Sequence, residues 1–370
     1  MRDNHQLWGG QFAQRLADLH SVQTEIARKI SENLGLRLSG SEQARLRKGS
    51  TNSAEAYQAY LKGNFYFAQQ TADSFQKAIQ SFTEATTLDP SWALPYVGLA
   101  NCYIFIGADA SLPPNEVMPK AKSYARKALM LDETLPEAHA SLGMVKLAYD
   151  WDWHAAEKEL GFNLQFSPQS VDAFSCALHY ADPIGGNETA ITQIKHTLEL
   201  DPLSLPPNLE FGCASYYGRH YDQAIQQFKE TLALYPNIPL VYYGLGRTYG
   251  QRRMYPDAVD ALNRGKAISG DWPPMLAELA YVQAMSGNAV EGRRLLEKLK
   301  TLAAHRYVDP YLLATAYVAL GETDQTFEWL DRAYMDRSSS MPWLKIEPKW
   351  DGLHSDARFT ALLDRVGFER

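Results

Sequence analysis

The sequence predicts an all-α solenoid of about eight stacked helix–turn–helix units. Pro168, Pro202 and Pro236 follow one another at intervals of 34 residues, which is the length of a two-helix unit. Inside the units, apolar and small residues recur at spacings of three and four, which places them on one face of a helix. Hydrophobic residues make up 45% of the chain, enough for the continuous core that stacked units require.

Each unit should contain two helices with different signatures. The clearest unit has Tyr242, Leu245, Gly246 and Tyr249 in its first helix, then Ala258, Leu262 and Gly265 in its second. A glycine such as Gly246 lets the two helices of its unit approach closely, because it has no side chain to separate them. The units are expected to begin near Ser53, Ser91, Thr134, Gln169, Leu203, Asn237, Asp271 and Val308.

This pattern resembles the tetratricopeptide repeat over residues 53–336. The resemblance implies a right-handed superhelix in which the first helix of each unit lines a concave groove. It also implies that the groove binds a protein or a peptide, so that the chain is a scaffold and not an enzyme.

Both ends of the chain are similar to one bacterial family of tetratricopeptide proteins. The tail has the string Trp343, Leu344, Pro348, Leu353, Asp356, Arg358, Phe359, Leu362 and Leu363. The start, "RDNHQLWGGQFAQRL", is similar to the end of the TolB-N-terminal-like module that precedes the repeats in bacterial regulators and kinase fusions. In those relatives a winged helix or a protein kinase lies upstream. The resemblance therefore implies a sensor or scaffold half, as a fragment or a short gene.

Three domains are expected: residues 1–52 as a remnant of the TolB-like module, 53–336 as the solenoid, and 337–370 as a loop with a capping helix. The remnant should form a strand near residues 5–12 and a helix near 21–34. It should either pack on the first repeat or pair with a second molecule as a homodimer, since an unpaired strand is a template for pairing. The capping helix is expected to begin at Ser355 and to bury Phe359 and Leu362.

The sequence contains none of the motifs that usually carry catalysis or bind a cofactor or metal, so none of these is expected. One alternative is a hydrolase, because Asp172, Ser175, His179 and Asp182 follow at spacings of three, four and three. Ser175 and His179 could then act as nucleophile and base. No glycine-rich turn stands beside them to stabilise an oxyanion, so a polar band in a binding groove is the preferred interpretation.

Charge and hydropathy restrict the partners. The formal net charge is −7, whereas a nucleic acid or an anionic membrane surface needs a basic footprint. No apolar run approaches the ~18 residues of a membrane span. We expect a protein or peptide partner, no nucleic acid and no membrane insertion. The cytoplasm is the expected compartment, or the periplasm if the chain lies downstream of a membrane segment.

The resemblance assigns the groove to side chains of the first helices. They are Tyr57, Tyr60, Asn64, Phe67, Asn101, Met144, His179, Tyr216, Tyr243, Arg247, Tyr281 and Tyr311. A lining of aromatic residues with few polar groups suits a peptide with apolar anchors. Two alternatives stay open: some of these residues pack on one another in a tight superhelix, or the chain is a self-assembly module.

Overall fold

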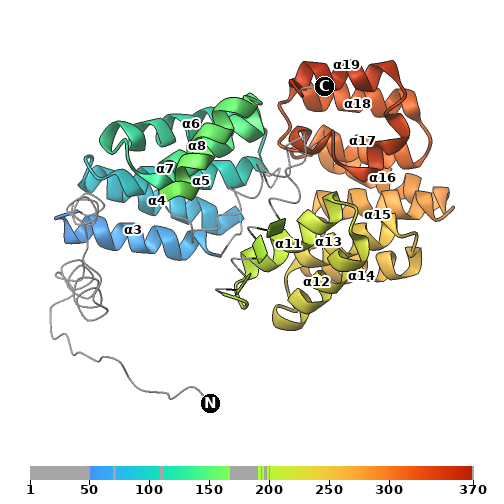
Figure 1. Ribbon diagram of the computed structural model, residues 1–370, viewed down its shortest axis with the longest axis horizontal. Coiled ribbons are helices and arrows are strands. Elements are labelled where there is room, and N and C mark those ends of the chain that lie inside the picture. The colour runs from blue at the N-terminus through green and yellow to red at the C-terminus, as the bar shows by residue number, and fades with distance from the viewer. Residues whose placement is uncertain are drawn as a thin grey trace, which may run out of the picture. The chain divides into compact units, whose positions relative to one another are not determined.

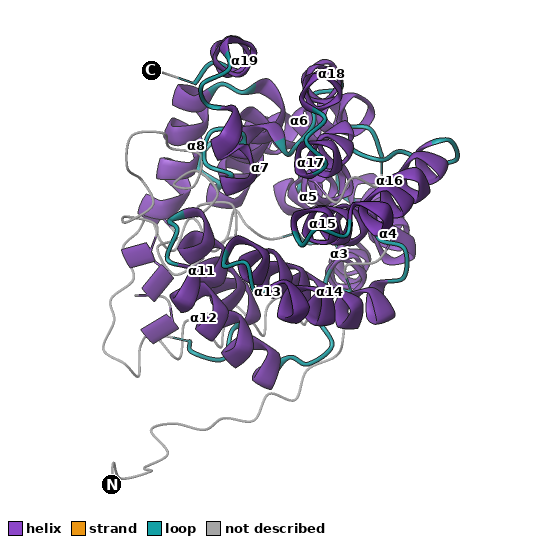
Figure 2. Ribbon diagram, turned by 90° about the vertical axis from the view of Figure 1, so that its right-hand side faces the viewer, coloured by secondary structure: helices purple, strands orange, loops and turns teal. Residues whose placement is uncertain are grey.

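The computed structural model of the chain describes residues 51–69, 72–108, 112–166 and 201–368, with six further residues between 191 and 199. The expected N-terminal strand and helix, and the unit expected near Gln169, lie outside the described residues. Within the described residues every regular element is a helix (Figures 1 and 2). The predicted all-α class is therefore confirmed, whereas the expected domain limits stay predictions.

The chain divides into two compact units, which we describe separately. The first comprises the described part of Met1–Cys102 together with Ser123–Ala138, and the second comprises Tyr103–Lys122 with the described part of His139–Arg370. The first unit contains α3 (Ala54–Phe67), α4 (Ala72–Leu88), the start of α5 (Ala93–Ala108) and the end of α6 (Pro114–Leu131). Helix α3 begins after Ser53, whose side chain accepts a hydrogen bond from the Ala56 backbone N–H.

The second unit holds the remaining helices, including the rest of α5 and α6 and all of α7 from His139 on. They are α7 (Pro136–Val145), η2 (Lys146–Asp150), α8 (Trp153–Phe166), α11 (Leu205–Tyr217), α12 (Tyr221–Leu234), α13 (Pro239–Gln251), α14 (Tyr255–Ser269), α15 (Pro273–Met285), α16 (Ala289–Ala303), α17 (Pro310–Ala319), α18 (Thr323–Met335), η3 (Met341–Trp343), η4 (Pro348–Leu353) and α19 (Ala357–Val366). Helix η2 is a π-helical turn and η3 and η4 are 3₁₀ turns.

The helices from α11 to α18 are arranged as repeated pairs. Each of α11, α13, α15 and α17 packs on the helix that follows it, and α11 packs on α13, α13 on α15, and α15 on α17. We name these four first helices the first-helix layer. Proline stands in the first turn of all four, where its missing N–H leaves no helical hydrogen bond unmade.

Glycines set the distance between neighbouring helices in both units. A side chain on Gly63 or Gly98 would lie within 3 Å of the Phe82 ring, and one on Gly212 or Gly244 within 3 Å of the Phe228 ring. Each phenylalanine belongs to the second helix of a pair and fills the space left by the first helices before and after it. Gly246 lies in the same way against Leu262 of α14, with a notional Cβ only 2.4 Å from the Leu262 Cγ. The predicted close approach at Gly246 is therefore confirmed.

The last helix, α19, packs on α18 and buries Phe359 and Leu362. Its N-cap is Asp356, whose side chain accepts a hydrogen bond from the Arg358 backbone N–H at 2.9 Å. The expected cap at Ser355 is wrong by one residue, because Asp356 is the residue with the extended backbone that precedes the first helical turn. Among the described helices, none combines the length and the hydropathy needed to cross a bilayer.

Candidate peptide-binding face

The first-helix layer carries an irregular stretch of the same chain. This stretch, residues 341–353, comprises η3, η4 and the turn between them, and we name it the C-terminal segment. Side chains from α11, α13, α15 and α17 contact it through Tyr216, Arg247, Glu278 and Tyr311 respectively. All four are buried, with at most 8% of each residue exposed.

Glu347 lies at the centre of these contacts. The Tyr216 hydroxyl donates a hydrogen bond to its Oε1 at 2.6 Å, and the Arg247 guanidinium lies 2.6 Å from its Oε2. Burial alone would raise the pKa of the Glu347 carboxyl, but the charges of Lys349 and Arg247 outweigh burial and lower the pKa to about 2. Glu347 is therefore ionised at neutral pH although only 4% of the residue is exposed.

Lys349 makes a second ion pair, two residues further along the segment. Its Nζ lies 3.0 Å from Oε2 of Glu278 and 3.3 Å from Oε1 of Glu347. Burial opposes the charge of this ammonium group, while Glu278 and Glu347 raise the pKa of Lys349 well above its ordinary value. Two cations and two anions thus share one buried cluster, and their charges cancel.

Aromatic residues enclose the ionic cluster. The Arg247 guanidinium carbon lies 3.8 Å from the ring centre of Tyr216 and 5.5 Å from that of Tyr243, distances typical of cation–π contacts. The Lys349 ammonium lies 5.4 Å from the ring centre of Tyr281. Rings replace water around both cations, which strengthens each charge–charge attraction because the local dielectric is low.

Two tryptophans hold the ends of the C-terminal segment. The Trp350 indole N–H donates to the Tyr311 hydroxyl at 2.6 Å, and Trp350 is completely buried. Trp343 stacks on Tyr217 with ring centres 5.3 Å apart. Arg219, in the turn after α11, donates to the Ile346 carbonyl oxygen at 2.8 Å.

The structure brings five of the predicted groove residues together, all around the C-terminal segment: Tyr216, Tyr243, Arg247, Tyr281 and Tyr311. Met144 of α7 packs in a small cluster with Leu147 that also includes Trp343. His179 and Ser175 lie outside the described residues. The assignment of this face to a ligand stays a prediction.

Four of the predicted residues lie in α3 and one in α5, in the first unit. Tyr57 and Tyr60 pack on Trp92, with ring centres 6.1 and 4.8 Å away, and Phe67 packs edge-on against Phe75. Asn64, in the same helix, forms a hydrogen bond with Tyr60 that partly offsets the rise in the Tyr60 pKa caused by burial. Asn101 lies in the middle of α5.

Sequence reasoning missed four residues that lie with the predicted tyrosines and Arg247 around the C-terminal segment. They are Glu278, Glu347, Lys349 and Trp350. One signal was available, because Glu278 is the only charged residue in the sequence of α15, "PPMLAELAYVQAM". A carboxylate in an otherwise apolar first helix indicates a buried cation opposite it. The tail itself carries no such signal, because a loop before the capping helix is all that its sequence predicts.

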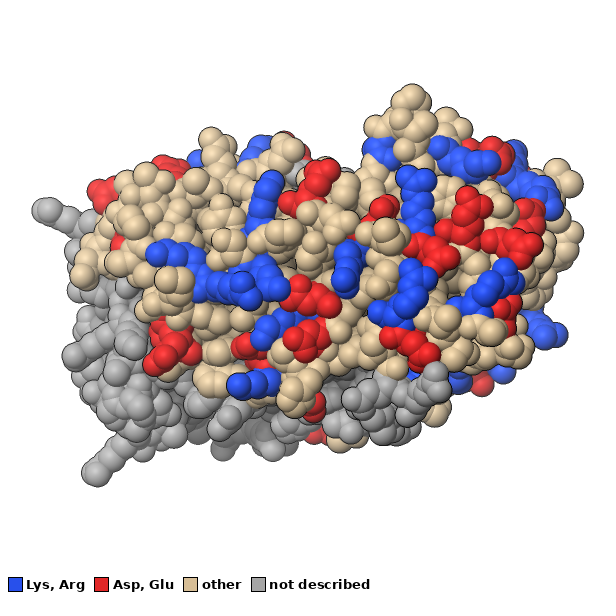
Figure 3. Space-filling model, turned by 90° about the horizontal axis from the view of Figure 1, so that it is seen from above, with Lys and Arg blue, Asp and Glu red and all other residues tan. Residues whose placement is uncertain are grey.

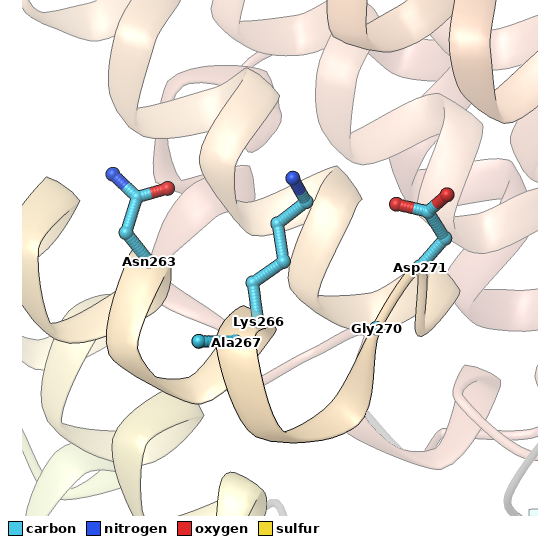
Figure 4. Close-up of a pocket in the computed structure, with 5 residues that line it drawn as sticks. All are labelled: Asn263, Lys266, Ala267, Gly270 and Asp271. Carbon is cyan, nitrogen blue, oxygen red and sulfur yellow. The ribbon is translucent and has the colours of Figure 1, made fainter.

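The remaining surface offers weaker candidates. A pocket of about 350 Å³ lies at the end of α14, where Asn263, Lys266 and Asp271 point to the same side (Figure 4). Its Asp271 is already paired with Lys298 at 2.5 Å. Cationic and anionic side chains are interspersed over the face seen in Figure 3. Within the described residues, no group of three or more His, Cys, Asp or Glu side chains is placed to hold a metal ion.

Comparison with known proteins agrees with this architecture. No family model matches the chain. The transcriptional regulator HilA of Salmonella typhimurium is 27% identical over 180 residues, which cover 47% of this chain and 32% of HilA. Human tetratricopeptide repeat protein 6 is 22% identical over 196 residues, which cover 52% of this chain and 35% of that protein. The chain thus spans about a third of the length of the curated relatives it matches.

Among solved structures, a human IFIT1 dimer with m7Gppp-AAAA covers 85% of this chain and 77% of its own, with 12% identity and a TM-score of 0.59. At this identity the likeness concerns the fold alone. The paired helices and the first-helix layer define a helical-repeat protein. Its 34-residue period and its small-residue contacts are those of the tetratricopeptide-repeat fold.

Proposed function

We propose that this chain is a non-catalytic scaffold that binds a peptide segment of a partner protein on the first-helix layer. One observation carries the proposal: the layer holds an irregular segment by side-chain contacts, with Tyr216 and Arg247 both engaging the Glu347 carboxylate. The C-terminal segment thereby supplies an example, within the chain, of the kind of ligand that the layer accommodates.

The chemistry of the layer supports peptide binding. Tyrosine and arginine are the residue types enriched at protein interfaces, because both combine a large contact area with a polar group. Here the rings of Tyr216, Tyr243 and Tyr281 surround two charged groups. Such a surface recognises a segment that offers one anchor ring and a matching pair of charges.

The biological setting we propose is that of a sensor. The chain is similar to part of a transcriptional regulator, and its ends are similar to bacterial proteins that join such repeats to an output domain. Peptide binding on the repeats would then report the presence of a partner to that domain. The homodimer expected through the N-terminal segment falls outside the described residues and stays a separate prediction.

The experiment uses a fluorescent peptide with the sequence of residues 341–353, "MPWLKIEPKWDGL", blocked at both ends. The protein is the full chain with Glu347→Ala, which weakens the hold of its own C-terminal segment. We expect fluorescence anisotropy to show saturable binding, and we expect the further substitutions Tyr243→Ala and Arg247→Ala to weaken it at unchanged helical content. Arg264→Ala, on the exposed face of α14, is the matched control. Equal binding by the layer variant and the control would contradict the proposal.

A further inference from the structure

The ionic cluster between the first-helix layer and the C-terminal segment does more than fill the core. Replacing a buried ion pair by apolar side chains of similar size is often neutral or stabilising, so ion pairs are a poor choice for a purely structural filling. What they supply is selection, because a like charge brought to the same place is repelled. Arg247 of α13 selects an anion and Glu278 of α15 selects a cation. The two selected charges lie two residues apart in the segment.

The C-terminal segment does not satisfy this cluster completely. Lys349 contacts Oε2 of Glu278, and among the described residues the buried Oε1 of Glu278 has no hydrogen-bond partner. The Nε of Arg247 is buried and equally without a partner in the described part of the chain. A buried polar atom left unpaired costs free energy. Another segment could therefore satisfy these buried groups better than the C-terminal segment does.

The unpaired oxygen indicates which ligand would be better. An ammonium group is a point charge, whereas a guanidinium group presents two parallel N–H donors that match the two oxygens of one carboxylate. An arginine in the place of Lys349 could engage both oxygens of Glu278. The residue after this arginine should still be aromatic, because the Tyr311 hydroxyl accepts a hydrogen bond from the Trp350 indole in the C-terminal segment.

We propose that Arg247 and Glu278 set the specificity of the first-helix layer for a partner segment of the form acidic–any–Arg–aromatic, and that residues 347–350 are a weaker internal version of it. This inference rests on the proposed function, because it names the partner class for the same face. The internal version occupies the layer until a partner segment displaces it. A tethered segment has an effective concentration on the order of millimolar, so the partner must bind more tightly than the internal copy.

The first test compares two probes, the 341–353 peptide and the same peptide with Lys349→Arg. On the full chain with Glu347→Ala, we expect the arginine probe to bind about tenfold more tightly, the effect of one added charge-assisted hydrogen bond. Adding Glu278→Gln should remove this preference, since its amide presents only one acceptor oxygen. Equal affinities of the two probes, or a preference that survives Glu278→Gln, would overturn the specificity assignment.

The second test reverses the charge of the site. Glu278→Lys places a cation opposite Lys349 in the full chain, and should free the layer by repulsion. This variant should bind a probe with Lys349→Glu and reject the unmodified probe. If it loses helical content, Glu278→Gln added to the Glu347→Ala chain replaces it, and should bind the unmodified probe more weakly than the Glu347→Ala chain does. Unchanged binding of the unmodified probe by either variant would overturn the assignment.

The third test concerns displacement. The unmodified probe should bind the wild-type chain at least tenfold more weakly than the Glu347→Ala chain. Equal binding would mean that the C-terminal segment does not compete, while the proposed function would stand. Failure of every probe to bind any variant would instead sink the proposed function itself. A wild-type dimer in light scattering that dissociates on adding probe would place the segment in a second copy of the chain, which would overturn its role as an internal ligand.

Discussion

Arg247 and Glu347 stand 100 residues apart in the chain, and their charged groups lie 2.6 Å apart in the fold. The pair connects the middle of α13 to a turn that follows the last repeat. The Arg247 guanidinium also lies 3.8 Å from the centre of the Tyr216 ring and 5.5 Å from that of Tyr243, so both rings and the carboxylate hold its position. A repeat face prepared in this way accepts a carboxylate with little reorganisation.

Removal of the Glu347 carboxylate charge should make the protein easier to unfold. We expect Glu347→Gln to lower the free energy of unfolding by about 3–5 kcal/mol, because Arg247 is then left buried without its counter-ion. Urea titration followed by circular dichroism measures the change. Asp351→Asn is the matched control in the same segment, since Asp351 pairs with Arg219 at the surface and should cost less than about 1 kcal/mol. Similar losses for both variants would contradict the buried pairing.

The stability of the wild-type chain should fall steeply in acid. The pKa of Glu347 in the folded chain is about 2, against an ordinary value of 4.5. A group whose pKa is lowered by folding stabilises the fold above its ordinary pKa, and this contribution is lost as the pH falls from about 4.5 towards 2. Urea unfolding at a series of pH values should therefore give a steeper slope in this window for wild type than for Glu347→Gln. Parallel curves would show that Glu347 has an ordinary pKa.

The indole–phenol contact of the segment can be tested by removing one partner and then both. Trp350→Phe deletes the N–H that Tyr311 accepts, and should destabilise by about 1–3 kcal/mol through the lost bond and the space that opens. Adding Tyr311→Phe removes the stranded hydroxyl and should restore part of the loss. If the second substitution adds its full separate cost, the two groups are not coupled.

The same glycine-to-alanine substitution should have opposite effects at a glycine that lies against a neighbouring helix and at one that does not. Gly246→Ala would bring a methyl group to 2.4 Å from the Leu262 Cγ, and should destabilise by about 1–3 kcal/mol through overpacking. Gly161→Ala, in α8, meets nothing within 4 Å and should stabilise by up to about 1 kcal/mol, because alanine favours the helix. Melting temperatures that move in the same direction would refute the packing described for Gly246.

Local signals in the sequence were sufficient to predict the repeats. The unit starts expected at Asn237 and Asp271 precede the first helices at Pro239 and Pro273 by two residues each. This succeeds because helical spacing, the prolines that follow the second helices and the small contact residues all act within 34 residues of one another. The cap of α19 was missed by one residue, because Ser355 and Asp356 are both good caps and only the backbone conformation separates them.

The candidate site was predicted on one side only. The resemblance to the repeat family assigns Tyr216, Tyr243 and Arg247 to the groove, because each stands in the first helix of its unit. The contacts of Tyr216 and Arg247 with Glu347 depend on how far the tail folds back, and periodicity carries no information about contacts 100 or more residues away. The lone carboxylate of α15, Glu278, was the available indication that a cation would lie opposite.

The most direct measurement is a double-mutant cycle on Arg247 and Glu347. The unfolding free energies of wild type, Arg247→Met, Glu347→Leu and the double variant give the coupling between the two side chains. If the C-terminal segment occupies the first-helix layer through this pair, the coupling should be about 2–3 kcal/mol, as for contacting residues in one buried network. A coupling within about 0.5 kcal/mol of zero, as for distant and independent sites, would contradict the seating of the segment on the repeats.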